Sequence, residues 1–229
     1  GGLQMPEIFT DHMVMQRNRP VKFWGTADAA TKVTVCFAGK TSTAQTGHNG
    51  KWTVEFPPMK AGGPYNATIE NQGRSIRLTD ILVGEVWICS GQSNMAFRLQ
   101  DASTAQKDIP RAANRQLRFF DMKEIAPTVA IEWNDNVLAE VNRLGYYRPA
   151  AWALSDSLTA RQFSAVAYYF GRMLQEELNV PIGLIQNAIG GSPTEAWIDR
   201  RTMERDPLMA DFFTNWNSSC QKCSYVCCL

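Results

Sequence analysis

The chain has 229 residues, of which 45% are hydrophobic, 20% charged and 10% aromatic, and its formal net charge is +1. This composition is typical of a globular protein with one large domain or two smaller ones. The 23 basic and 22 acidic residues form no block of one sign, and no apolar run approaches the roughly 20 residues that span a bilayer. The sequence therefore argues against nucleic-acid binding and membrane insertion.

Residues 1–80 show the pattern of short strands separated by turns. Apolar and polar side chains alternate, with β-branched and aromatic enrichment, over 20–25, 32–37 and 51–56, which predicts three strands. Sequences typical of turns, such as His48-Asn49-Gly50, stand between them. Strands at this spacing with no helical period predict a small antiparallel β-sandwich domain.

The pattern changes to that of an α/β domain near residue 80. A nearly continuous apolar run over 81–89 predicts a strand that is covered on both faces. Residues 117–120 and 181–185 are further candidate strands. Strands that alternate with a helix are typical of a parallel sheet with crossover connections, so we expect an α/β domain behind the β-domain.

The clearest helix is predicted over 164–179. Its apolar side chains recur at the spacing of one helix face. Ser164 is suited to cap its first turn, and Pro181 prevents the helix from continuing. Residues 102–113 also have a helix-like composition, although Pro110 must interrupt or end such a helix.

A polar, glycine-containing turn follows the strand predicted at 81–89. The run from Gly84 to Met95 reads GEVWICSGQSNM, which places Ser93 beyond the carboxyl end of that strand. In open α/β sheets this edge is where ligands bind. A serine there can offer its hydroxyl to a substrate while amides of the turn face a developing oxyanion. The same residues also suit a plain capped turn with Ser93 as the N-cap.

A second block reads VPIGLI over 180–185 and AIGGSPTEAW over 188–197. The two blocks, with Met13-Val14-Met15-Gln16 and Trp24-Gly25 near the N-terminus, are similar to those of the sialate O-acetylesterases, which are SGNH-type carbohydrate esterases. The resemblance covers about residues 5–215. It implies an SGNH-hydrolase-like, three-layer α/β/α parallel-sheet domain that is incomplete and follows the antiparallel β-sandwich. The expected α/β part spans residues 81–215.

The resemblance implies that Ser93 is the nucleophile that removes O-linked acetyl groups from sialic acid. Its own backbone amide would be one oxyanion donor, and the pair Gly190-Gly191 would supply a second. Taken by itself, a Gly-Gly pair after a strand is also an ordinary strand-to-helix connection.

Four further residues are candidates for contact with the sugar. The resemblance implies that Gln92 and Asn94 flank the nucleophile on the substrate side, and that Glu195 and Trp197 line the cleft. Asn94 can equally position the turn, and a tryptophan beside an α/β sheet is as readily a core residue. The implied partner is an O-acetylated sialic acid or a related acetylated glycan.

A serine hydroxyl needs a positioned base, usually a histidine held by a carboxylate. The chain contains only His12 and His48, which both lie in predicted turns of the β-domain and are not expected to serve. The family's base lies in an Asp-x-x-His sequence, and no such sequence occurs here. We therefore expect the front part of an esterase, with weak or no turnover of its own.

Two alternatives remain open at this stage. The chain can be a non-catalytic glycan-binding or structural remnant, because the base is missing. It can also be an acetylesterase for another polysaccharide, because the serine machinery would be the same and only the substrate pocket would differ.

Neither a nucleotide cofactor nor a metal is expected. The chain lacks the Gly-x-Gly-x-x-Gly fingerprint, the Gly-Lys-Ser/Thr phosphate loop and the His-Glu-x-x-His motif. Ester hydrolysis of the SGNH type needs only the serine, its base and oriented amides. The resemblance implies an extracytoplasmic location, which is periplasmic or secreted in a bacterium and lysosomal or secreted in an animal. The Gly1-Gly2 start suggests that any targeting peptide has been removed.

Residues 216–229 form a cysteine-rich tail with four of the six cysteines. A zinc knuckle would need a two-residue spacer where Cys227 and Cys228 are adjacent, and no histidine lies nearby. We expect this tail to be non-native or disordered.

Overall fold

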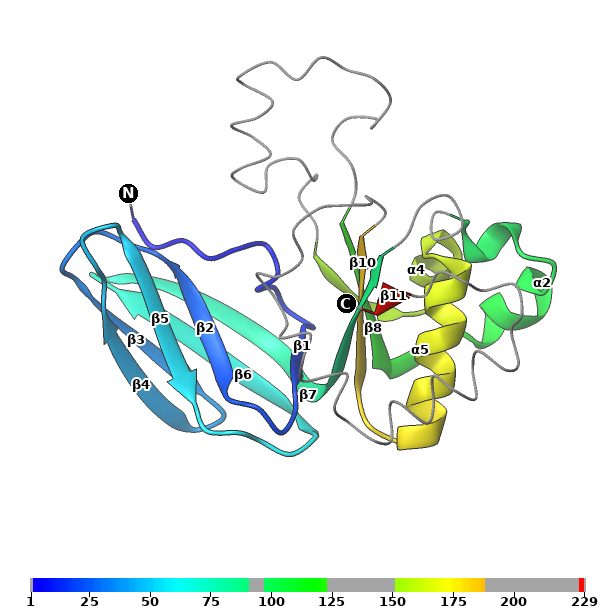
Figure 1. Cartoon of the computed structure of the whole chain (residues 1–229), viewed down its shortest axis with the longest axis horizontal. Helices are drawn as coiled ribbons and strands as arrows, with labels where there is room; N and C mark the ends of the chain where they lie inside the picture. Colours follow the sequence, from blue (N-terminus) through cyan, green and yellow to red (C-terminus); the bar gives the residue numbers. More distant parts are fainter. Residues whose placement is uncertain (1, 91–96, 123–150, 188–226, 229) are drawn as a thin grey trace, which may run out of the picture.

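The structure is a computed structural model that describes residues 2–90, 97–122, 151–187 and 227–228. Figure 1 shows a strand-rich part joined through β7 to a second part in which helices lie against a sheet. The strands are β1 (Val14–Gln16), β2 (Val21–Thr26), β3 (Lys32–Phe37), β4 (Lys40–Gln45), β5 (Lys51–Phe56), β6 (Gly62–Asn71), β7 (Arg74–Ser90), β8 (Asn114–Met122), β9 (Trp152–Ser155), β10 (Ile182–Asn187) and β11 (Cys227–Cys228). The helical segments are η1 (Leu99–Asp101), α2 (Ala105–Asp108), η2 (Ile109–Arg111), α4 (Ser157–Gln162) and α5 (Ala165–Leu178).

The long strand β7 belongs to both parts of the molecule. Its first half pairs antiparallel with β6, and its second half pairs parallel with β10. The strand order along the sheet is β4-β3-β6-β7-β10-β8-β9. Asp80, at the position of the expected domain boundary, has a left-handed φ of 54°. The pairing with β6 shifts register beside it, so β7 bends through a bulge there rather than ending.

The three strands predicted in the N-terminal part are present as β2, β3 and β5. Buried and exposed residues alternate along each of them, as the period-two pattern requires. Phe23, Phe37 and Phe56 meet at ring-centroid distances of 5.2–5.9 Å in the resulting core. β2 and β5 form a sheet of their own, whereas β3, β4 and β6 join the sheet that continues through β7. A separate β-sandwich domain therefore stays a prediction.

The second part is an α/β arrangement on a mixed sheet. β7, β10 and β8 run parallel, as predicted, and β9 adds to β8 in the antiparallel sense. The predicted helix is confirmed as α5: the Ser164 hydroxyl accepts a hydrogen bond from the amide of Ala167 at 3.3 Å, and Asn179 ends the helix with φ 51°. The helical segments in the region 102–113 are α2 and the single 3-10 helix η2, which contains Pro110.

Both faces of the parallel strands are covered. On one face Trp87, Leu117 and Leu184 pack with residues of α5. The opposite face shares its core with the N-terminal part. A Cβ on Gly183 would lie 2.8 Å from the Cβ of Val14 and 2.9 Å from the Trp152 ring. The sheet is thus buried on both sides, as its nearly continuous apolar sequence indicates.

Candidate active site

Three parallel strands end side by side at one edge of the sheet. In the pairing register, Asn187 of β10 lies between Ser90 of β7 and Met122 of β8. Ligands of open α/β sheets bind beyond the carboxyl ends of the strands, so this edge is the candidate site. The predicted site residues themselves lie outside the described residues; they are Gln92, Ser93, Asn94, Gly190, Gly191, Glu195 and Trp197.

Phe97 is the first described residue after the Ser93 block, and it lies close to the start of α5. The amide of Ala165 donates to the carbonyl of Phe97 at 2.8 Å, and the amide of Leu99 donates to that of Phe163 at 2.9 Å. Arg98 and Ser164 thus form an isolated antiparallel bridge. The segment that follows the Ser93 block is therefore fixed to the N-terminal end of α5.

The end of β10 is fixed to the same point by a residue that sequence reasoning missed. The Oε1 atom of Gln186 accepts a hydrogen bond from the amide of Ser164 at 3.0 Å, and both residues are buried. The available signal was a polar residue, Gln186, directly after the apolar run IGLI of the same strand.

Cys89 is fully buried in β7 one residue before the strand ends. Burial raises the pKa of its thiol to about 12. Because the thiolate is the nucleophilic form of cysteine, Cys89 is not a nucleophile at neutral pH. β11 pairs antiparallel with β7 at this end, placing Cys228 opposite Cys89 and Cys227 opposite Ser90. The expectation that the tail is non-native or disordered stays a prediction.

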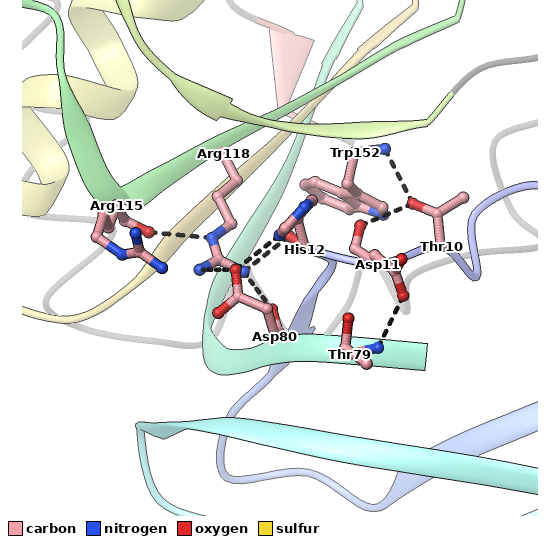
Figure 2. A network of polar contacts seen from close by, with 8 residues as sticks. All are labelled: Thr10, Asp11, His12, Thr79, Asp80, Arg115, Arg118 and Trp152. Atoms are coloured by element: carbon pink, nitrogen blue, oxygen red, sulfur yellow. Dashed lines mark hydrogen bonds and ion pairs between the residues drawn. The ribbon is translucent and has the colours of Figure 1, made fainter. Parts of the chain in front are cut away.

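A histidine–carboxylate pair exists in the chain, but it lies near the middle of β7, before the half that leads to the Ser93 block. The Nδ1 atom of His12 is 2.6 Å from Oδ2 of Asp80 (Figure 2). Asp80 stands ten positions before Ser90 along β7, and a strand rises about 3.3 Å per residue. His12 is therefore held at the opposite end of the α/β half of β7 from the Ser93 block, and we do not expect it to be the base of Ser93.

The same carboxylate binds a buried arginine of β8. Arg118 is 1% exposed, and its Nη2 atom lies 3.1 Å from Oδ2 of Asp80. Its Nη1 atom donates to the carbonyls of His12, at 3.0 Å, and of Asp80. Its Nε atom donates to the carbonyl of Arg115 at 3.0 Å. One guanidinium thus joins β8, β7 and the segment before β1 (Figure 2).

Trp152 of β9 is tied to the same N-terminal segment. Its backbone amide donates to the hydroxyl of Thr10 at 3.0 Å, and its ring Nε1 donates to the carbonyl of Ile8 at 2.9 Å. The carboxylate of Asp11 accepts from the amide of Thr79 at 2.8 Å. Residues 8–12 therefore connect β9 of the α/β part to β7.

The contacts of Asp80 predict that the stability of the fold depends on pH in the acid range. Burial raises the pKa of this carboxyl, but the bonds from His12 and Arg118 outweigh burial and hold the pKa below its ordinary value of 3.8. A carboxyl whose pKa is lower in the folded state stabilises the fold above its unfolded pKa, and this stabilisation is lost as the pH falls through the folded pKa. We expect Asp80→Asn to flatten the fall in melting temperature below about pH 4.

The exposed Asp101 supplies the matched control for this measurement. Thermal melts of the parent chain, Asp80→Asn and Asp101→Asn between pH 2 and pH 7 give the slope of melting temperature against pH for each protein. An unchanged acid slope in Asp80→Asn would contradict the prediction.

Two further observations concern the part of the chain that the structure describes. No three His, Cys, Asp or Glu side chains gather there in a way that could hold a metal ion. None of its helices is both long enough and apolar enough to cross a bilayer.

Comparison with known proteins places this arrangement in a class. No protein-family model matches the chain. A carbohydrate acetylesterase from Xanthomonas citri has a similar structure over 87% of this chain and 43% of its own, with a TM-score of 0.68 and 30% sequence identity. The chain therefore has the α/β esterase fold of a carbohydrate acetylesterase.

The relatives found by sequence belong to a narrower class of enzyme. The chain is 32% identical over 217 residues to the sialate O-acetylesterase of Rattus norvegicus and 31% identical over 215 residues to that of Homo sapiens, in both cases over 89% of its length. The resemblance to the sialate O-acetylesterases is thus confirmed. The chain spans about two-fifths of the length of these relatives, 39% and 40%.

Proposed function

We propose that this chain is the nucleophile-bearing part of a carbohydrate acetylesterase, and that its substrate is an O-acetylated sialic acid. The observation that carries the proposal is the register of β7 and β10, which puts Ser90 opposite Asn187. Ser93 is three positions past Ser90, and Gly190-Gly191 are three and four positions past Asn187. A serine and paired glycines that leave neighbouring strands at one edge are suited to act on one carbonyl group.

The proposed reaction is acyl transfer through Ser93. Its hydroxyl oxygen attacks the acetyl carbonyl carbon while a base takes the hydroxyl proton. The backbone amides of Ser93 and of the Gly190-Gly191 pair stabilise the oxyanion. The bond from the acetyl carbon to the sugar oxygen then breaks, and the sugar leaves with the proton. Water hydrolyses the acetyl-serine to acetate and restores the hydroxyl.

The base belongs to a group outside these 229 residues. His12 is bonded to Asp80 in the middle of β7, ten positions before Ser90, and His48 stands in an exposed turn between β4 and β5. Because a serine without its base keeps only the catalysis due to binding and the oxyanion donors, the chain alone is expected to turn over weakly or not at all.

The remaining site assignments follow from the same proposal. Gln92 and Asn94 adjoin the nucleophile in sequence and are assigned to the substrate, as are Glu195 and Trp197. We place the protein outside the cytoplasm, where acetylated glycans are exposed: in the periplasm or secreted in a bacterium, lysosomal or secreted in an animal. The support for this location is the sequence likeness to the sialate O-acetylesterases.

A fluorophosphonate probe tests the nucleophile, because a single attack by the serine oxygen on its phosphorus labels the protein covalently and no turnover is needed. Because the oxyanion donors assist the attack even without the base, we expect slow labelling of the parent chain at high probe concentration and none of Ser93→Ala. Ser157→Ala is the matched control, since Ser157 is an exposed serine of α4. Labelling that persists in Ser93→Ala, or is absent from the parent, would overturn the proposal; sugar binding without labelling would favour a non-catalytic remnant.

The substrate is tested separately by acetate release. Parallel assays with O-acetylated sialic acid and with acetylated xylan compare the two sugars at equal enzyme concentration. A preference for xylan would replace the sialic-acid assignment with that of a polysaccharide acetylesterase.

A further inference from the structure

Gln186 is a buried polar residue in a strand whose other described side chains are apolar. It is 7% exposed and stands one residue before the end of β10. A strand covered on both faces is ordinarily apolar throughout, so a glutamine here needs a partner. Its Oε1 atom has one in the amide of Ser164, at 3.0 Å.

The Gln186–Ser164 bond is not needed to cap α5. The hydroxyl of Ser164 already accepts from the amide of Ala167 at 3.3 Å, which is the usual capping bond. The amide of Ser164 lies before the helix, between Phe163 and Ala165, which pair with Leu99 and Phe97. The bond therefore links the end of β10 to the strand-like contact beyond the Ser93 block.

In sequence, the two described segments that this bond connects lead to the two that the proposed mechanism requires. Phe97 follows Ser93 by four residues, and Gly190 follows Gln186 by four residues. A relative shift of the two segments would change the distance from the serine oxygen to the second oxyanion donor. Misplacement of reacting groups by about 1 Å can cost about a hundredfold in rate.

We propose that Gln186 is a positioning residue for acyl transfer: its side-chain oxygen, bonded to Ser164, holds the end of β10, which leads to Gly190-Gly191, to the segment at Phe97, which follows Ser93. This inference rests on the proposed function and deepens it by adding a residue to the same site. Gln186 touches no reacting atom in this assignment.

The chain offers a matched control at the opposite end of α5. Gln175 also joins the helix to the sheet, since its Oε1 accepts from Asn114 at 3.0 Å and its Nε2 donates to Gln116 at 3.1 Å. Both partners belong to the first residues of β8, at the amino-terminal edge. Gln175→Leu therefore removes helix–sheet hydrogen bonds as Gln186→Leu does, but away from the candidate site.

The test is the rate of fluorophosphonate labelling, resolved into the maximal rate and the apparent affinity for the probe. We expect Gln186→Leu to lower the maximal rate about tenfold to a hundredfold while the apparent affinity stays unchanged. Gln186→Glu keeps an oxygen acceptor for the amide of Ser164, next to a helix N-terminus that favours negative charge, and should restore most of the rate. Gln175→Leu should label like the parent.

Circular dichroism and melting curves establish that each variant is folded. Should Gln186→Leu not fold, Gln186→Asn takes its place, because the shorter side chain withdraws the acceptor from Ser164. Equal slowing in Gln186→Leu and Gln175→Leu, full-rate labelling of Gln186→Leu, or no rescue by Gln186→Glu would each overturn the inference while leaving the proposed function standing. A parent chain that does not label would overturn the proposed function, and this inference with it.

Discussion

Arg118→Met is expected to lower the free energy of unfolding by about 3–5 kcal/mol, the range for removing one partner of a buried ion pair. Methionine preserves most of the packing of the arginine stem. The loss comes from the carboxylate of Asp80 and the carbonyls of His12 and Arg115, which accept from the guanidinium. These acceptors would have no replacement donor from the methionine side chain.

Arg172→Met is the control, because it makes the same substitution at an arginine that is more exposed to solvent. Arg172 pairs with Asp108 and Glu176 at 3.3 Å and is 33% exposed, so its removal should cost at most about 1 kcal/mol. Urea denaturation of the parent and both variants compares the two costs at constant m-value. Similar costs for the two arginines would show that the buried network contributes no special stability.

The Arg118 network also bears on cooperativity. Its bonds join β8 of the α/β part to β7 and to the residues before β1. We therefore expect the two parts to unfold in one transition in the parent, by both fluorescence and circular dichroism. Asp80→Asn combined with Arg118→Met should cost much less than the sum of the two single changes, because the residues share one interaction.

The elements that the sequence predicts are those whose burial follows a simple period. β2, β3 and β5 alternate buried and exposed residues, and α5 carries one apolar face. β4 was missed because its sequence KTSTAQ has no buried face to reveal it. Such a strand exists through its pairing with β3, which is a tertiary contact.

The residues that fix the site were harder to foresee than the site itself. The Ser93 block is recognisable because a serine turn follows a buried strand, and the register of β7 with β10 supports the edge inferred from that pattern. Arg118 lies within the predicted strand at 117–120, where an arginine would ordinarily be expected to face water. Its burial depends on Asp80 and His12, which are 38 and 106 positions away. No local pattern contains that information.

Gly84→Ala is expected to be the most damaging small substitution at the junction of β7 and β10. A Cβ on Gly84 would lie 1.9 Å from the carbonyl oxygen of Pro181 and 2.7 Å from its carbonyl carbon. Both are backbone atoms, and the same oxygen accepts from the amide of Glu85 at 2.9 Å. Relief would require the two strands to separate where their pairing begins, so we expect a cost of about 3 kcal/mol, the upper end for overpacking.

Gly39→Ala separates this steric cost from the cost of backbone strain. Gly39 has φ 79° with nothing within 4 Å of its Cβ position, so alanine there meets only the left-handed penalty of about 1–2 kcal/mol. Gly84 has neighbours but is not among the glycines with positive φ. Chemical denaturation of both variants compares the two costs, and a smaller loss in Gly84→Ala would mean that β7 and β10 do not approach this closely. Because the two strands lead toward Ser93 and Gly190, a folded Gly84→Ala protein should also show slower fluorophosphonate labelling, whereas Gly39→Ala should not.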